Sequence, residues 1–74
     1  MKSPLRNTIR EHRAVRSMTQ QELADLIYVT RQTVIAIEGN KYSPSLEVAF
    51  RIAHVFNVAL ERVFQYDPPR GRAK

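Results

Sequence analysis

Seventy-four residues make one small domain, and the absence of cysteine excludes a disulfide as well as a thiolate zinc site. No apolar stretch is long enough for a signal peptide or a membrane span, so we expect a cytoplasmic protein without a membrane partner. The formal net charge of +5 suits a polyanionic partner, but a solvated surface explains that charge equally well.

The first predicted element is an amphipathic helix over residues 5–16. Its apolar side is formed by residues at helical spacing, namely Leu5, Ile9 and His12. The arginines of this segment are expected on a solvated face: Arg6, Arg10 and Arg13. Of these, Arg10 or Arg13 could also reach a DNA backbone.

Two short amphipathic segments follow, over residues 20–27 and 31–38. Thr19 and Glu22 have the spacing of a capping box, in which each side chain accepts from an orphan backbone N–H. Thr30 is placed to cap the second segment. Two capped helices this close must cross steeply to bury their apolar faces. This is the arrangement of a helix-turn-helix, whose second helix can enter the DNA major groove.

Tyr28 stands in the turn between these segments, where a positive φ would cost a bulky residue about 1 kcal/mol. Two interpretations stay open. The ring lies on the surface, or its hydroxyl reaches a phosphate or a partner subunit. Gly39 and Asn40 end the second helix, because either residue can adopt a left-handed cap.

A more apolar helix is predicted over residues 44–56, with Ser43 as N-cap and Pro44 in the first position. Asn57 should cap its end, and Val58 should fold back onto it. The side chains expected to form the floor of the core are Leu46, Ala49, Phe50, Ile52, Ala53 and Phe56.

A short helix over residues 59–64 is the last predicted element, and it is too short to be stable alone. It presents more apolar surface than a monomer tolerates, which favours a partner chain. The domain therefore spans residues 1–66, and residues 67–74 should form a disordered basic tail.

Taken together, these residues resemble the lambda repressor/Cro, or XRE, family of helix-turn-helix regulators. Within it they are similar to short single-domain proteins of the kind that repress cytolysin operons. The resemblance rests on matching positions in both central segments: Gln20, Leu23, Ala24, Ile27, Val29, Thr30, Gln32, Thr33, Val34, Ile37 and Glu38. It implies an all-α, compact five-helix lambda-repressor-like domain. It also implies a symmetric dimer built on the last helix, through Leu60, Val63, Phe64 and Tyr66.

Some features of the chain depart from the family pattern. Ser17 stands where the family usually has glycine, which argues against a left-handed helix end there. In cytolysin-type relatives the chain ends add β-strands to the dimer seam. The Ser3-Pro4 pair argues against such an N-terminal strand here.

The helix-turn-helix predicts which side chains meet DNA. The exposed first turn of the second helix, and one residue a turn later, should contact base edges: Arg31, Gln32, Thr33 and Ala36. Residues at the helix ends should contact phosphates: Gln20, Thr30, Asn40 and Lys41. Among these, Gln20 resembles the phosphate-anchoring glutamine of the family.

These features predict a sequence-specific transcriptional regulator of double-stranded DNA, a repressor acting as a homodimer on a palindromic operator. An antitoxin or bridging module that holds an unidentified protein partner stays open, as does a restriction-modification controller. An enzyme is not expected, because no carboxylate pair in an evident cleft, serine with a base partner or glycine-rich phosphate loop is found. No cofactor or metal is expected either, since His12 and His54 lack partners at ligand spacing.

Overall fold

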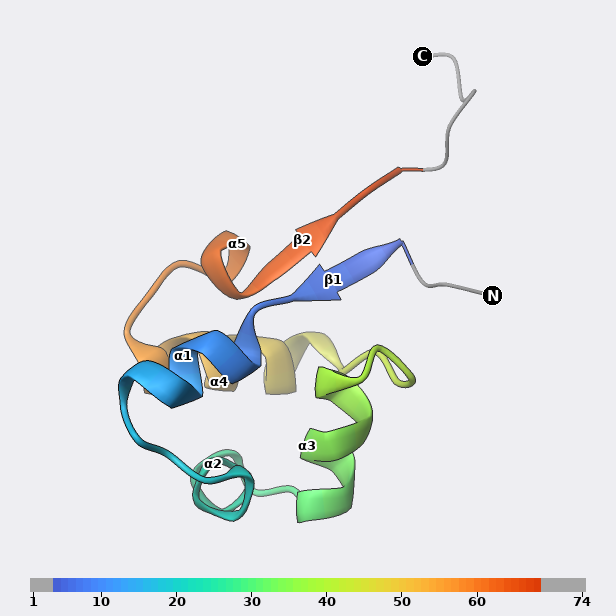
Figure 1. The fold of residues 1–74 in the computed structure, drawn as a ribbon. Coiled ribbons are helices and arrows are strands. Elements are labelled where there is room, and N and C mark those ends of the chain that lie inside the picture. Colours follow the sequence, from blue (N-terminus) through green and yellow to red (C-terminus); the bar gives the residue numbers. More distant parts are fainter. Residues whose placement is uncertain (1–3, 69–74) are drawn as a thin grey trace.

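The structure, a computed structural model, describes residues 4–68 and contains five helices and a two-stranded sheet in that range (Figure 1). The elements in chain order are β1 (Leu5–Asn7), α1 (Ile9–Val15), α2 (Gln20–Ile27), α3 (Arg31–Glu38), α4 (Leu46–Phe56), α5 (Leu60–Val63) and β2 (Phe64–Tyr66). The predicted five-helix domain is therefore confirmed, with the small sheet as an addition. In Figure 1 the sheet and α5 lie at one end of the view, and α2 lies at the other.

The start of the first helix was predicted wrongly. The helix begins at Ile9 rather than at residue 5, because the preceding residues form β1, which pairs antiparallel with β2. The Ser3-Pro4 pair does not prevent this strand. The Pro4 carbonyl accepts the Asp67 N–H at 2.7 Å, and that bond makes no use of the N–H that proline lacks.

Asp67, which we placed in the tail, is likewise tied to β1. The Arg6 guanidinium donates to both oxygens of its carboxylate, with Nη2 at 3.2 Å from Oδ1. We call this Arg6–Asp67 pair the strand clasp. The disorder predicted for the tail beyond Pro68 lies outside the described residues.

One hydrophobic core joins the helices. Its largest fully buried side chains come from all five helices: Ile9, Leu23, Ile27, Val34, Ile37, Ile52, Phe56 and Val63. The predicted burial of Leu46 and Phe50 is wrong, since they are 67% and 53% exposed. At helical spacing, Leu46 and Phe50 lie to one side of the face that Ala49, Ile52, Ala53 and Phe56 bury. The helix also begins later than predicted, with Ser45 rather than Ser43 as N-cap.

The caps of the two central helices were predicted correctly. The Thr19 hydroxyl accepts the Glu22 N–H at 3.0 Å, and the Glu22 carboxylate accepts the Thr19 N–H at 2.8 Å. The Thr30 hydroxyl accepts the Thr33 N–H at 3.2 Å. Both helices consequently begin at the predicted residues, which fixes where the turn between them lies.

Four residues other than glycine take a left-handed backbone among those described: Ser17, Tyr28, Asn40 and Asn57. Ser17 takes the left-handed backbone that we expected it to avoid, with φ 52°. This conformation costs serine more free energy than it would cost glycine. Tyr28 has φ 63°, as predicted, and its ring is 81% exposed. The ring lies 5.4 Å from the Arg51 guanidinium, so it rests on the protein surface.

Titration of Asp67 tests the strand clasp. The hydrogen bond from Arg6 lowers the pKa of the Asp67 carboxyl below its ordinary value. Because this pKa is lowered, the clasp stabilises the strand pair at pH values above the ordinary carboxyl pKa. That stabilisation is lost as the pH falls through the lowered pKa of Asp67. Carbon-detected NMR should show the pKa of Asp67 below the ordinary carboxyl value, and Arg6→Gln should move it upward. An Asp67 pKa that Arg6→Gln leaves unchanged would show that the clasp does not form.

Candidate nucleic-acid interface

The third helix has one face anchored in the core and the other open to solvent. Val34 and Ile37 of α3 are 1% and 2% exposed. Arg31 and Gln32, in the first turn, are exposed. Figure 1 shows α3 along one side of the molecule with no described element outside it. The predicted recognition helix is therefore free on its polar side.

The predicted base-contact residues are not equally available. Arg31 and Gln32 are exposed, and within residues 4–68 no side-chain hydrogen bond or ion pair holds them against the protein. Thr33 is half-buried, and its hydroxyl lies 3.1 Å from the Thr30 hydroxyl. Ala36 is half-buried one turn later. The long polar side chains at the start of α3 are thus best placed to reach base edges.

A buried ion pair ties the end of α3 to the rest of the domain. The Glu38 carboxylate accepts from Arg13 Nε at 2.6 Å and from Nη2 at 3.1 Å. Its side chain is only 3% exposed, and that of Arg13 is 14% exposed. Arg13 Nη1 also donates to the Met18 carbonyl at 2.9 Å, before α2. From sequence we expected Arg13 on a solvated face. Instead, it joins α1, the α1–α2 connection and α3.

Gln20 belongs to the same network. Its Nε2 donates to Glu38 Oε1 at 3.3 Å, and the residue is half-buried at the start of α2. Glu38 uses one of the two N–H donors of this amide, and the backbone N–H donors of the α2 N-terminus beside it are groups that suit a phosphate.

An open hollow of about 720 Å³ lies in front of this network. Its lining comes from α1, the start of α2 and the start of α3: Arg10, Arg13, Thr19, Gln20, Gln21 and Arg31. Two exposed guanidinium groups, those of Arg10 and Arg31, therefore flank the α2 N-terminus. The basic character of the lining and the α2 dipole both suit an anion. From sequence we expected Arg10 on a solvated face, with contact to a DNA backbone as the alternative.

The other end of α3 carries two predicted phosphate contacts, Asn40 and Lys41. Both are exposed. The Lys41 N–H donates to the Ala36 carbonyl at 2.9 Å, and Asn40 has φ 60°. This is the hydrogen-bond pattern of a left-handed helix end. It places Asn40 and Lys41 just beyond the last turn of α3, at the opposite end of the helix from Arg31.

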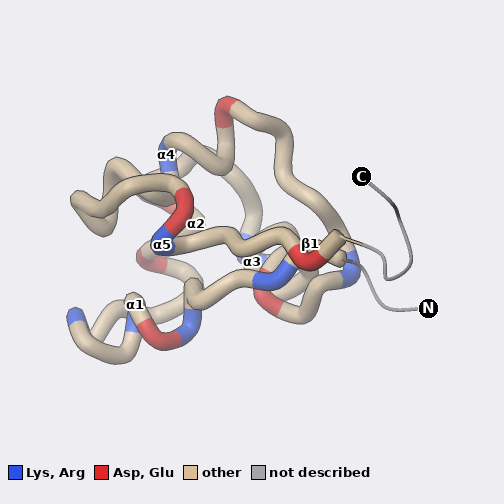
Figure 2. The backbone as a smooth tube through the Cα atoms, turned by 90° about the horizontal axis from the view of Figure 1, so that it is seen from above, with Lys and Arg blue, Asp and Glu red and all other residues tan. Residues whose placement is uncertain are grey.

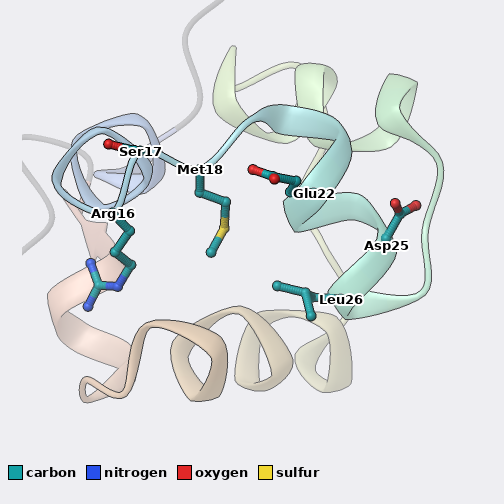
Figure 3. A pocket seen from close by; sticks show the side chains of 6 residues that line it. All are labelled: Arg16, Ser17, Met18, Glu22, Asp25 and Leu26. Carbon is teal, nitrogen blue, oxygen red and sulfur yellow. The ribbon is translucent and has the colours of Figure 1, made fainter.

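Charge alone does not mark this surface. Figure 2 shows Lys and Arg spread over α1, α4, α5 and β1, with Asp and Glu between them. Another hollow lies between the α1–α2 connection and α2 (Figure 3), and its lining residues are Arg16, Ser17, Met18, Glu22, Asp25 and Leu26. The carboxylates of Glu22 and Asp25 would repel a phosphate there, so this hollow is unsuited to DNA.

The histidines have structural surroundings. The His12 ring stacks on Phe56, with 5.1 Å between the ring centroids, and its Nε2 lies 3.2 Å from the Arg62 carbonyl. His54 is exposed on α4. Within residues 4–68, no group of three His, Asp or Glu side chains is arranged to hold a metal ion. None of the helices in that range has the length and apolar character needed to cross a bilayer.

The predicted dimer residues divide into two kinds. Tyr66 is 62% exposed on β2, whereas Leu60 and Phe64 are half-buried against the core. Val63 is fully buried within its own chain. Its side chain therefore cannot contact a partner, and Val63 instead supports the surface from beneath.

A family model described as helix-turn-helix matches residues 9–63. The chain belongs to the XRE family of helix-turn-helix proteins. It is 46% identical over 63 residues to an uncharacterised HTH-type transcriptional regulator of Methanocaldococcus jannaschii, with 85% of this chain and 96% of that protein covered. It is 57% identical over 49 residues to another from Methanothermobacter thermautotrophicus, covering 66% of this chain and 71% of the relative. The HTH-type regulator YgzD of Bacillus subtilis is 42% identical over 60 residues, covering 81% and 91%.

Solved structures show the same fold. A protein of Bacteroides fragilis described as DNA-binding superposes with a TM-score of 0.74 at 24% identity, covering 82% of this chain and 98% of that one. The clp gene regulator ClgR of Corynebacterium glutamicum gives a TM-score of 0.67 at 23% identity, covering 70% and 55%. The helix arrangement of this XRE-family chain is therefore shared with these two solved structures.

Replacement of Glu38 tests whether the ion pair anchors α3. Glu38→Ala leaves the Arg13 guanidinium, which is largely covered, without its counter-charge, and we expect a loss of about 1.5–3 kcal/mol in the free energy of unfolding. That is a large share of the total for a domain of this size. Urea denaturation at fixed protein concentration measures it.

Glu47→Ala is the matched control. The Glu47 carboxylate is 75% exposed and pairs with Arg51 one helical turn later, so its loss should cost about 0.5 kcal/mol or less. If Glu38→Ala costs no more than Glu47→Ala, the buried pair does not hold α3 in place.

Proposed function

We propose that this XRE-family chain is a sequence-specific transcriptional repressor that binds a palindromic operator as a homodimer, with α3 in the major groove. The observation that carries the proposal is the capped start of α3. There Arg31 and Gln32 are exposed, while the opposite face of the helix is locked into the core. The relatives named as HTH-type transcriptional regulators support the regulatory part of this proposal.

The chemistry of this turn matches base edges. An arginine guanidinium suits the O6 and N7 acceptors of guanine, and a glutamine amide suits N6 and N7 of adenine. Phosphates on either side would be met by the α2 N-terminus, with Gln20 and the Arg10 side chain, and by Asn40 and Lys41 beyond α3. Such an arrangement sets register at both ends of the helix and leaves its first turn to read sequence.

A single recognition helix contacts only a few base pairs, which is too little to select one operator, so we infer that two chains bind together. Two copies related by a two-fold axis place their recognition helices about 34 Å apart, one turn of DNA. The surface proposed for this contact combines Leu60, Phe64 and Tyr66 from α5 and β2. A partner packed there would cover the half-exposed apolar side chains next to the β1–β2 sheet. Repression then requires only that the bound dimer occupy promoter DNA.

Substitution of the first turn of α3 tests base readout. An operator is first selected from random duplex DNA. Arg31→Ala and Gln32→Ala should then each weaken binding to it about 5–150-fold, because each bidentate base contact contributes about 1–3 kcal/mol. Binding to unrelated DNA should change far less, and fluorescence anisotropy at constant salt measures both.

Arg62→Ala is the control for charge, because it removes one cation from α5, which Figure 1 shows apart from α3. It should weaken binding to all sequences alike. If Arg31→Ala behaves in the same way as Arg62→Ala, Arg31 contributes charge and no sequence readout.

Charge introduced at Tyr66 tests the dimer surface. Tyr66→Glu should shift the protein from dimer to monomer in sedimentation equilibrium, since it buries a carboxylate in an apolar contact. Phe50→Glu is the matched control, because Phe50 is 53% exposed on α4, away from β2. If Phe50→Glu dissociates the dimer and Tyr66→Glu does not, the two copies meet through α4 instead.

A further inference from the structure

Asn7 uses its side-chain acceptor to begin α1. It is the last residue of β1, opposite Phe64 in the strand pair. Its Oδ1 accepts the Ile9 N–H at 3.1 Å. Thr8, the formal N-cap of α1, makes no side-chain cap bond. The side-chain oxygen of Asn7 therefore caps the start of α1.

Asn7 uses its side-chain donors at the far end of another helix. Its Nδ2 donates to the Ile37 carbonyl at 3.0 Å and to Asn40 Oδ1 at 3.1 Å. The Ile37 carbonyl also accepts the Asn40 N–H at 3.0 Å. Both acceptors lie at the C-terminal end of α3, so one amide joins β1, α1 and the end of the recognition helix.

These backbone partners determine how both amides are oriented. A backbone N–H must face an acceptor and a backbone carbonyl must face a donor, so Oδ1 of Asn7 points to Ile9 and Nδ2 points to Ile37. The Asn7 Nδ2 is then a donor to Asn40, which must present its oxygen. The Asn40 amide nitrogen is left on the other side of its planar group. That nitrogen is the part of Asn40 that can donate to a phosphate.

We propose that Asn7 is a positioning residue for DNA binding, which turns the Asn40 amide so that its N–H donors face a phosphate. This rests on the proposed function, in which Asn40 meets the DNA backbone. It adds that a β1 residue, distant in sequence from the helix-turn-helix, sets the geometry of the contact. Because the Asn7 backbone pairs with Phe64, the same side chain also links the strand pair beside the proposed dimer surface to the end of α3.

Asn7→Asp is the sharpest variant for this role. The aspartate keeps an oxygen for the Ile9 N–H, so the cap of α1 is retained. It replaces the donor by a second acceptor, which faces the Ile37 carbonyl and Asn40 Oδ1 and repels both. Asn40 can no longer be held with its nitrogen outward. Circular dichroism establishes that the variant is folded before its binding is measured.

A double-mutant cycle separates positioning from added charge. Asn40→Gly removes the amide and suits the left-handed backbone of residue 40, where φ is 60°. In the natural background Asn7→Asp should weaken operator binding about tenfold, the size of a lost hydrogen bond to a charged group. In the Asn40→Gly background it should weaken binding less than about twofold. Equal losses in both backgrounds would overturn the proposal, because they would mean that Asn7 does not act through Asn40.

Asn57→Gly is the control for the glycine substitution, since Asn57 also has a left-handed backbone, with φ 58°, but ends α4. It should leave operator affinity within about twofold. If Asn57→Gly loses as much operator affinity as Asn40→Gly, the effect comes from the more flexible glycine backbone. That result would overturn the phosphate contact of Asn40.

An NMR readout keeps this inference distinct from the proposed function. In the free protein, Asn7→Asp should shift the Asn40 side-chain amide resonances, whereas Asn57→Gly should not. Unchanged Asn40 resonances would overturn the positioning role. If the natural chain selects no DNA sequence, the proposed function fails and the phosphate contact fails with it. The same spectra still decide whether Asn7 positions Asn40.

Discussion

The buried pair between Arg13 and Glu38 is the interaction on which the presentation of α3 depends. A helix of eight residues is not stable alone, so its position must come from tertiary contacts. Core packing of Val34 and Ile37 fixes which face points outward. The ion pair fixes the end of the helix, because a carboxylate that is 3% exposed cannot leave the guanidinium without losing its partners. The geometry matters more than the energy, since desolvation offsets much of the attraction within such a pair.

Several weak local devices then act on the same helix. The Thr30 hydroxyl sets where α3 begins, and the left-handed Asn40 sets where the chain turns away. Asn7 reaches the last turn from the strand pair. With both ends held, the free side chains of the first turn can meet DNA without first ordering the backbone. Preorganisation of this kind lowers the entropy cost of binding.

Local chemistry explains why much of the fold was predictable. The capping spacing of Thr19 and Glu22 and the cap at Thr30 depend on near neighbours alone, and both central helices began where predicted. The first strand was not predictable in this way. The spacing of Leu5 and Ile9 favours a helix, but residues 5–7 instead pair with β2, about sixty residues away. No local sequence pattern predicts that pairing. The same holds within the site for Arg13 and Asn7, whose partners lie on other elements. The exposure of the polar residues in the first turn of α3 could be predicted from the sequence. The contacts of the side chains that hold the helix in place could not.

The most direct measurement is an NMR titration of the isotope-labelled protein with its selected duplex. Residues 30–36 and the side-chain resonances of Arg31 and Gln32 should show the largest changes, with two chains bound per duplex. The outer face of α4, around Phe50, should stay unchanged. The largest changes at that face, or saturation at one chain per duplex, would contradict readout by paired α3 helices.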